Sequence, residues 1–159
     1  MTESKTKGRI LIADDNPVNQ ELLEAYLADE DYEIDFASDG LETLEKVSSF
    51  SPDVILLDIM MPKLSGFEVC ETLKKSIPTK NIMILMVTAL SDLGDIERAV
   101  SAGCDDYLSK PIHKPELIKR VENMLKLRNI SDENERLRRY IDSIEDSMAP
   151  AQPPAPKGD

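Results

Sequence analysis

The sequence has few of the residues that most often build metal centres and nucleophilic active sites. It contains no tryptophan, one histidine and two cysteines. Cys70 and Cys104 form no ligand motif, so we expect both to be small apolar residues of the core. His113 has no partner at ligand spacing and is expected on the surface. Any metal site in this chain would therefore depend on oxygen ligands.

Long apolar runs and an excess of positive charge are also missing. No apolar run approaches the ~20 residues that a membrane-spanning helix needs. The first eight residues are polar and lack the apolar core of a signal peptide. The formal net charge is −12, which argues against direct binding of nucleic acid and against attraction to an anionic membrane. A cytoplasmic protein without either partner is the expectation.

Short apolar runs do occur, and they alternate with amphipathic segments. The expected strands cover residues 9–13, 32–37, 53–57, 81–87 and 104–108. The expected helices cover residues 16 to about 29, 41–47, 67–75, 91 or 92 to about 102, and from about 114 onward. Five strands alternating with five helices predict a parallel sheet with right-handed crossovers.

The polarity of the strands predicts their order. The first, third and fourth runs are apolar throughout and suit central strands, whereas the second alternates with polar residues and suits an edge. The predicted fold is therefore α/β, a flavodoxin-like doubly wound five-stranded parallel sheet in the order 2-1-3-4-5.

Polar side chains stand at the ends of four of these strands. Asp14 and Asp15 follow the first strand, Asp58 the third, Thr88 the fourth and Lys110 the fifth. In a doubly wound sheet the carboxyl ends of the strands share one edge, where ligands bind. We therefore expect these five residues to converge.

The grouped residues suit phosphoryl transfer. Three carboxylates in one place raise one another's pKa values, and a hard cation such as Mg²⁺ would relieve the repulsion. A metal ion, the Lys110 ammonium and the Thr88 hydroxyl around one carboxylate would position and neutralise a phosphoryl group. Asp58 would be the attacking nucleophile and would form an aspartyl phosphate. Taken singly, Asp58 could be a solvated turn residue, Lys110 a surface lysine and Thr88 a strand-end cap.

Over about residues 8–127 the sequence resembles the receiver domain of two-component response regulators. The resemblance rests on Asp14-Asp15, Asp58 followed by Met60-Met61-Pro62 and Gly66, Thr88-Ala89, and Lys110-Pro111.

The resemblance implies a role for each of these positions. Asp58 would accept a phosphoryl group from a histidine kinase or phosphotransfer protein. Mg²⁺ would be bound by Asp15 directly, by Asp14 largely through water, by Asp58, and by the backbone carbonyl of Met60. Thr88 and Lys110 would bind phosphoryl oxygens. Tyr107 occupies the family's aromatic switch position, and the Lys110–Pro111 bond would be cis.

Two other functions remain open beside the phosphorylation switch. A stand-alone aspartyl-phosphate phosphohydrolase would use a similar site, but such enzymes usually carry a second aspartate two residues beyond the nucleophile, where this chain has Met60. The chain could also be an interaction module that needs no phosphate, although the acidic trio argues against it. We expect a phosphoacceptor whose own chemistry is limited to self-phosphorylation and autodephosphorylation, rather than an enzyme.

The last helix carries a second apolar pattern beyond the predicted sheet-packing residues. Apolar or amide residues recur at alternating spacings of three and four, which is the heptad pattern of a coiled coil. This seam consists of Leu127, Ile130, Asn134, Leu137, Ile141, Ile144 and Met148. Asn134 at an a position favours two strands in register, so a parallel homodimer is expected. The alternative is a solvated helix, or one folded back on its own domain.

The chain thus divides into four predicted segments. These are a disordered N-terminus (1–8), a receiver domain (9–126), a coiled-coil helix (127–148) and a Pro/Ala-rich disordered tail or linker (149–159). A receiver, a coiled coil and a linker are the layout expected upstream of an output domain. None is recognisable here, so the chain is expected to be part of a longer protein or to act on a separate partner.

Overall fold

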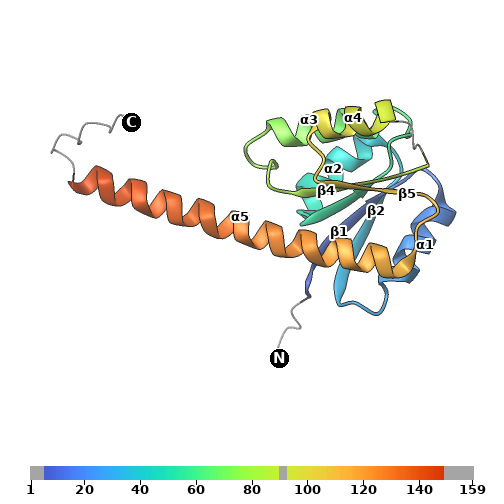
Figure 1. Ribbon diagram of the computed structural model, residues 1–159, viewed down its shortest axis with the longest axis horizontal. Coiled ribbons are helices and arrows are strands. Elements are labelled where there is room, and N and C mark those ends of the chain that lie inside the picture. Colours follow the sequence, from blue (N-terminus) through green and yellow to red (C-terminus); the bar gives the residue numbers. More distant parts are fainter. Residues whose placement is uncertain (1–5, 90–92, 149–159) are drawn as a thin grey trace.

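The computed structural model describes residues 6–89 and 93–148, which form a five-stranded sheet flanked by five helices (Figure 1). The strands are β1 (Gly8–Ala13), β2 (Tyr32–Ala37), β3 (Val54–Leu57), β4 (Met83–Thr88) and β5 (Asp106–Ser109). The helices are α1 (Pro17–Leu27), α2 (Gly40–Phe50), α3 (Gly66–Lys75), α4 (Leu93–Ala102) and α5 (Lys114–Met148).

The sheet has the predicted topology. Its strand order is β2-β1-β3-β4-β5, and every neighbouring pair is parallel. The three central strands carry the continuous apolar runs, because both of their faces are covered by helices. The flavodoxin-like fold is therefore confirmed.

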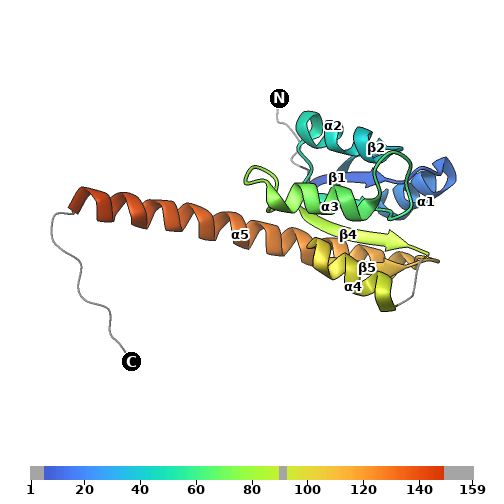
Figure 2. The same ribbon diagram turned by 90° about the horizontal axis from the view of Figure 1, so that it is seen from above.

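Alternating residues of each strand enter two separate cores. In β3, Ile55 and Leu57 pack with α2, α3 and α4, whereas Val54 and Leu56 pack with α1 and α5. Figure 2 shows the same two layers, with α1 and α5 on one face of the sheet and the other three helices on the opposite face. This double covering fixes the sheet and so the positions of the residues that follow its strands.

Local signals fix where the helices near the site begin. The Asn16 side chain caps α1 by accepting a hydrogen bond from the backbone N–H of Val18, and Pro17 occupies the first turn. Ser65 and Glu68 form a capping box at the start of α3. The chain therefore turns sharply into a helix soon after β1 and again after the β3 loop.

The start of the chain departs from the prediction. Gly8, predicted to be disordered, is the first residue of β1 and pairs with Tyr32. The backbone N–H of Lys7 donates to the carbonyl of Asp31, which extends the pairing by one residue. A β-carbon on residue 8 would lie 2.8 Å from a side-chain methyl of Leu125 in α5, so Gly8 packs directly beneath this helix.

Several element bounds also differ from the prediction, because turns satisfy the backbone groups concerned. α1 ends at Leu27 rather than near residue 29, since the N–H of Ala28 bonds back to Ala25. β4 begins at Met83 because the N–H of Ile82 bonds to Thr79. β5 begins at Asp106, since the N–H of Cys104 bonds to Ala99 at the end of α4.

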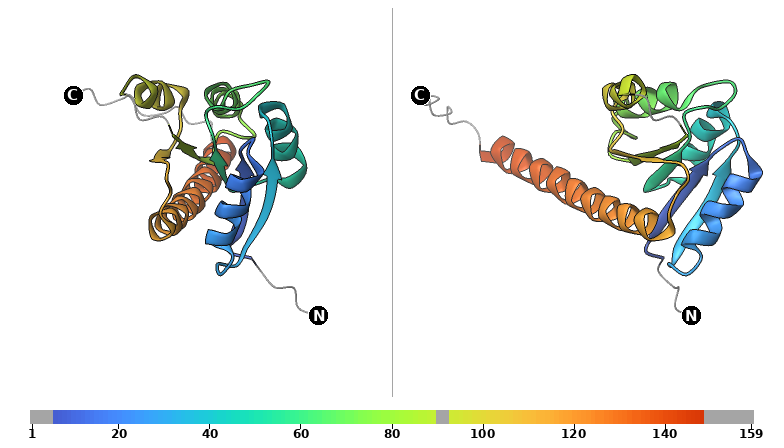
Figure 3. Two further views of the ribbon diagram at one scale, coloured as in Figure 1. Left: turned by 90° about the vertical axis from the view of Figure 1, so that its right-hand side faces the viewer. Right: turned by 45° about the vertical axis from the view of Figure 1, so that its right-hand side comes forward.

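Helix α5 is continuous over 35 residues and projects far beyond the sheet (Figure 3). Its first half buries Leu117, Val121 and Met124 against the sheet. The seam residues described beyond them are exposed: Leu127, Ile130, Asn134, Leu137 and Ile141. The fold-back alternative is therefore wrong for this part of the helix, whereas pairing with a second helix stays a prediction.

Some sequence-based predictions fall outside the described part of the chain. Residues 1–5 of the predicted disordered N-terminus lie there, as do residues 90–92, which include the predicted caps of α4, and residues 149–159. The side chains of Ile144 and Met148 also lie outside it. Among the described residues, no helix combines the length and the apolar character that crossing a membrane would require.

Candidate functional site

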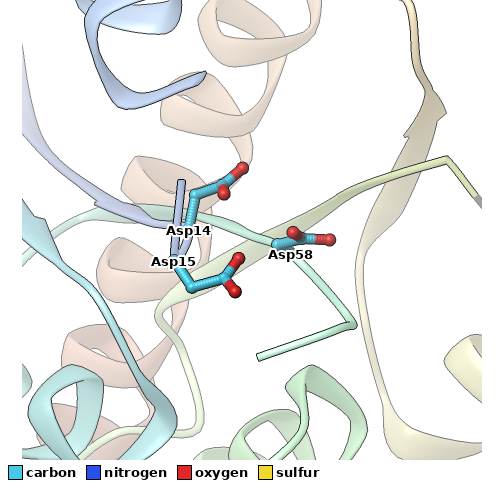
Figure 4. Close-up of side chains that lie close together, drawn as sticks. All are labelled: Asp14, Asp15 and Asp58. Carbon is cyan, nitrogen blue, oxygen red and sulfur yellow. The ribbon is translucent and has the colours of Figure 1, made fainter. Parts of the chain in front are cut away.

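Three aspartates gather at the carboxyl ends of β1 and β3 (Figure 4). Asp14 and Asp15 follow β1, and Asp58 follows β3 directly. Because the two strands pair with Ala13 opposite Leu57, the residues after them are brought side by side. One carboxylate oxygen from each aspartate lies within 4.8 Å of the others, the one such acidic cluster among the residues described. The sequence prediction that these residues converge is correct for all three.

Asp14 is the buried member of the cluster, with 2% of its surface exposed. One carboxylate oxygen accepts a hydrogen bond from the backbone N–H of Asn16 at 2.9 Å, and the other lies 3.2 Å from the Lys110 ammonium. Asp15 is exposed. The two neighbouring carboxylates therefore differ in access to solvent: one is held by the protein, and the other is open to an ion from outside.

Asp58 is 7% exposed and has limited compensation for a negative charge. Burial raises the pKa of its carboxyl group, and the nearby Asp14 carboxylate raises it further. The Lys110 ammonium, 3.5 Å away, and the Met60 N–H, 3.4 Å away, act in the opposite direction. Because burial has the largest effect on this pKa, an additional positive charge nearby would stabilise the ionised form of Asp58.

The backbone holds Asp58 in place from two sides. Its N–H donates to the carbonyl of Ala13 at 2.9 Å, which continues the ladder between β1 and β3. Gly66, at the start of α3, packs so closely that a β-carbon there would lie 2.4 Å from the Asp58 carbonyl oxygen. The glycine is therefore required by this close approach, and it lets α3 begin directly beneath the phosphoacceptor candidate.

Thr88 and Lys110 complete the edge from β4 and the loop after β5. Thr88 is buried, and its carbonyl accepts a hydrogen bond from the N–H of Lys110 at 2.8 Å. The Lys110–Pro111 peptide bond is cis, as the family resemblance implies. The Lys110 ammonium lies near the carboxylates of both Asp14 and Asp58. The residues at the ends of the fourth and fifth strands therefore converge with the aspartates, as predicted.

Tyr107 lies on β5 opposite Met86 of β4. It is half-buried against the core that α3 and α4 cover. One strand, β4, lies between β5 and the strand that Asp58 follows, and this position is compatible with a conformational role. The aromatic switch itself stays a prediction.

One positioning residue escaped the sequence analysis. The Gln20 side-chain amide donates to the carbonyls of Asp14 at 2.7 Å and Ala37 at 3.3 Å, so it ties the end of β1 to the end of β2. The signal was a glutamine one turn into α1, on the side that faces the sheet. Its role depends on a long-range contact with residue 37, which local spacing does not reveal.

The donor atoms at this edge suit Mg²⁺. Hard oxygen ligands from one or more carboxylates, with room for waters on the exposed side, are the arrangement that Mg²⁺ favours. Asp14, Asp15 and Asp58 supply oxygens of this type from the ends of two adjacent strands, and the Met60 carbonyl as a further ligand stays a prediction. A parallel α/β sheet with three carboxylates, a lysine and a threonine grouped at its carboxyl edge is the arrangement on which the resemblance to receiver domains rests.

The chain belongs to the response regulator receiver domain family, whose model matches residues 10–122. It is 41% identical over 126 residues to the response regulator PleD of Caulobacter vibrioides, covering 79% of this chain and 28% of PleD. It is 38% identical over 118 residues to the DNA-binding regulator RpaA of Synechocystis, covering 74% of this chain and 49% of RpaA. The matching part thus spans less than half of either relative.

Two solved receiver domains show the same fold. One comes from a signal transduction histidine kinase of Syntrophus aciditrophicus, with a TM-score of 0.71 and 32% identity, covering 75% of this chain and 90% of that one. The other belongs to the sensor histidine kinase PA1611 of Pseudomonas aeruginosa, with a TM-score of 0.70 and 30% identity, covering 75% and 98%. That structure holds a magnesium ion coordinated in its active site cleft.

Proposed function

We propose that Asp58 accepts a phosphoryl group from a histidine kinase or a phosphotransfer protein in a reaction that needs Mg²⁺. The observation that carries this proposal is the grouping of Asp14, Asp15 and Asp58 within reach of one ion, with Lys110 beside two of them. No other cluster of this composition occurs among the described residues. Magnesium in the cleft of a similar receiver supports the choice of ion.

The residues at the site divide the chemistry between them. An Asp58 oxygen forms a bond to phosphorus while the phosphorus–nitrogen bond of the donor breaks, and the donor imidazole keeps the electron pair and takes a proton. When bound, Mg²⁺ supplies positive charge to the carboxylates and the phosphoryl oxygens. The Lys110 ammonium binds one phosphoryl oxygen and the Thr88 hydroxyl another. We propose that no residue of this chain activates water as a second aspartate would, since Met60 occupies that position.

An apolar surface beside Lys110 suits the donor protein. Val18 and Leu22 of α1 are 69% and 42% exposed, although both are large apolar residues. Leu22 also lines a pocket of about 220 Å³ that extends to Lys110 and Pro111. We propose that a helix of the kinase or phosphotransfer protein packs here and presents its phosphohistidine to Asp58. A cytoplasmic location would agree with such a donor and stays a prediction.

Intact-mass measurement tests the phosphoacceptor. With Mg²⁺ and acetyl phosphate as donor, the wild-type chain should gain one phosphoryl group, and Asp58→Asn should gain none. Asp35→Asn is the matched control, because Asp35 is another strand aspartate paired with a lysine, at 3.1 Å from Lys46. Equal phosphorylation of Asp58→Asn and Asp35→Asn would refute the assignment of Asp58 as the phosphoacceptor. If neither variant were phosphorylated, a general loss of the fold, rather than loss of the nucleophile, would explain the result, and the assignment would fail.

We propose further that phosphorylation signals through paired α5 helices to an output domain or a separate partner. Thr88 would move toward the phosphoryl group and Tyr107 would follow it inward, shifting the balance between two existing states. The exposed seam residues lie about 100–180° around the helix from Arg128, which faces the receiver. A second helix can therefore pack on the seam without meeting the receiver of its own chain.

Disulfide cross-linking tests the parallel register. In a chain without its two native cysteines, Asn134→Cys should form a disulfide between two copies, because a-position residues of a parallel dimer face one another. Tyr140→Cys is the control, since Tyr140 is 64% exposed but lies about a third of a turn from Asn134 around the helix. Equal cross-linking of both variants, or none of Asn134→Cys, would contradict the proposed pairing.

A further inference from the structure

Asp53 organises the end of β3 opposite the phosphoacceptor candidate. Its backbone N–H donates to the carbonyl of Arg9, and its own carbonyl accepts from the N–H of Met83, so it joins three neighbouring strands. One oxygen of its carboxylate accepts a hydrogen bond from the N–H of Arg9 at 2.9 Å. β3 has only four residues, which places Asp53 directly before the strand and Asp58 directly after it.

The other oxygen of the Asp53 carboxylate holds α5. The Arg128 guanidinium donates to it from Nε at 3.0 Å, and the two side chains are 21% and 33% exposed. Arg128 follows the buried Met124 by one turn on the same face of the helix. It therefore fastens the helix at the point where the buried part ends and the exposed seam begins.

Because of the position of this ion pair, a small tilt of α5 there displaces the far end of the helix strongly. From Arg128 to Met148 the helix runs for about 30 Å, so a tilt of about 10° at the joint moves its end by about 5 Å. The sheet-packing residues Leu117, Val121 and Met124 resist sliding, but they all precede the joint. A bond at Arg128 is therefore well placed to resist tilting.

We propose that the Asp53–Arg128 ion pair sets the direction in which α5 leaves the receiver, and that it thereby sets the orientation of the two receivers on a paired coiled coil. The second part rests on the helix pairing proposed above. The first part concerns one chain alone. Asp53 and Arg128 are positioning residues: neither touches the phosphoryl site, and β3 connects the joint to Asp58.

A distance within one chain tests the joint directly. Spin labels are attached at Glu24→Cys on α1 and Tyr140→Cys on α5, both exposed positions, in the full chain with its two native cysteines replaced by alanine. The labelled chain is diluted with unlabelled chain, so that pairs across a dimer contribute little. Arg128→Gln is then compared with Lys46→Gln, which removes the same charge from another half-exposed ion pair, Lys46 with Asp35.

Arg128→Gln should broaden the distance distribution by about twofold, in keeping with the modest strength of a partly exposed ion pair. Lys46→Gln should keep the parent distribution, and Arg128→Lys, which retains the charge, should stay closer to the parent than to Arg128→Gln. Identical widths for Arg128→Gln and Lys46→Gln would overturn the proposal. A monomeric wild-type chain would instead refute the helix pairing and leave this distance measurement valid.

Discussion

The receiver and the projecting part of α5 differ in how they bury apolar side chains. In the receiver, the largest residues of the three central strands are inaccessible, among them Leu56 and Leu85. In α5 beyond Arg128, Ile130 and Leu137 are 51% and 57% exposed. The two regions share a continuous chain, but only the receiver completes its own core. The helix needs a second surface to gain the same stabilisation.

The contrast also matches the division of roles proposed above. The receiver positions charged groups by fixing the ends of its strands, so its site exists within one chain. The projecting helix carries an exposed apolar pattern, which in the proposed pairing packs against a second helix.

Leucine truncation should separate the two regions most strongly. Leu56→Ala should lower the free energy of unfolding of the receiver by about 2–5 kcal/mol, because the removed atoms leave a cavity in a closed core. Leu137→Ala should change it by less than about 0.5 kcal/mol. Urea unfolding of both variants, monitored on the receiver, gives the comparison. Similar losses would mean that the projecting helix belongs to the receiver's folding unit.

Removing the site lysine should slow phosphorylation without loss of fold. Lys110→Ala should reduce the initial rate with acetyl phosphate and Mg²⁺ by about 10²-fold, the usual effect of deleting one preorganised donor to a developing charge. Lys114→Ala is the control, since Lys114 forms a looser pair with Asp29 at 3.8 Å on the surface. If both variants react at the same rate, Lys110 does not bind the phosphoryl group.

Mg²⁺ should stabilise the receiver by mass action. At ten times its dissociation constant, a single bound ion raises the free energy of unfolding by about 1.4 kcal/mol. Thermal unfolding of the wild type and Asp35→Asn should show this rise, and Asp58→Asn should show a smaller one. The same rise in all three proteins would place the ion elsewhere.

The smallest effect concerns Tyr32, at the edge of the sheet. Its hydroxyl is buried without a hydrogen-bond partner among the described residues, so Tyr32→Phe should stabilise the fold by about 1 kcal/mol. Burial, followed by the charges of Glu30 and Glu122, raises its pKa from 10.0 to about 12.

The raised pKa of Tyr32 also fixes the direction of a pH effect. In the unfolded chain this tyrosine ionises near pH 10, but in the folded chain it stays neutral, so ionisation favours unfolding. Wild-type stability should therefore fall as the pH rises from about 10 toward 12, and Tyr32→Phe should lose less over this window. The exposed Tyr140 provides the control as Tyr140→Phe. An equal loss in both variants would contradict the role of Tyr32.

Local sequence patterns predicted the sheet and most of the site, for a physical reason. Continuous apolar runs mark strands covered on both faces, and parallel strands bring the residues that follow them to one edge. Asp58, Thr88 and Lys110 could therefore be grouped without knowledge of any contact between them. Their distances and the raised pKa of Asp58 required the folded arrangement, because burial is a property of the whole core.

Features that depend on distant contacts were not predictable. Gly8 belongs to β1 because its backbone pairs with Tyr32, a residue 24 positions further along the chain. The bond from Arg128 to Asp53 links residues 75 positions apart, and both residues look like ordinary surface charges in the sequence. Periodicity indicates which face of an element is apolar, but it does not identify the partner of a single charged residue.

The mass of the intact chain in solution, with Mg²⁺ and with or without beryllofluoride, tests the division most directly. The wild type should form a dimer in at least the beryllofluoride-bound state, whereas a variant carrying both Ile130→Glu and Leu137→Glu should be a monomer that still binds beryllofluoride. A wild-type monomer in both conditions would contradict the proposal that a second copy packs on the seam of α5. A variant that dimerises as well as the wild type would contradict it too.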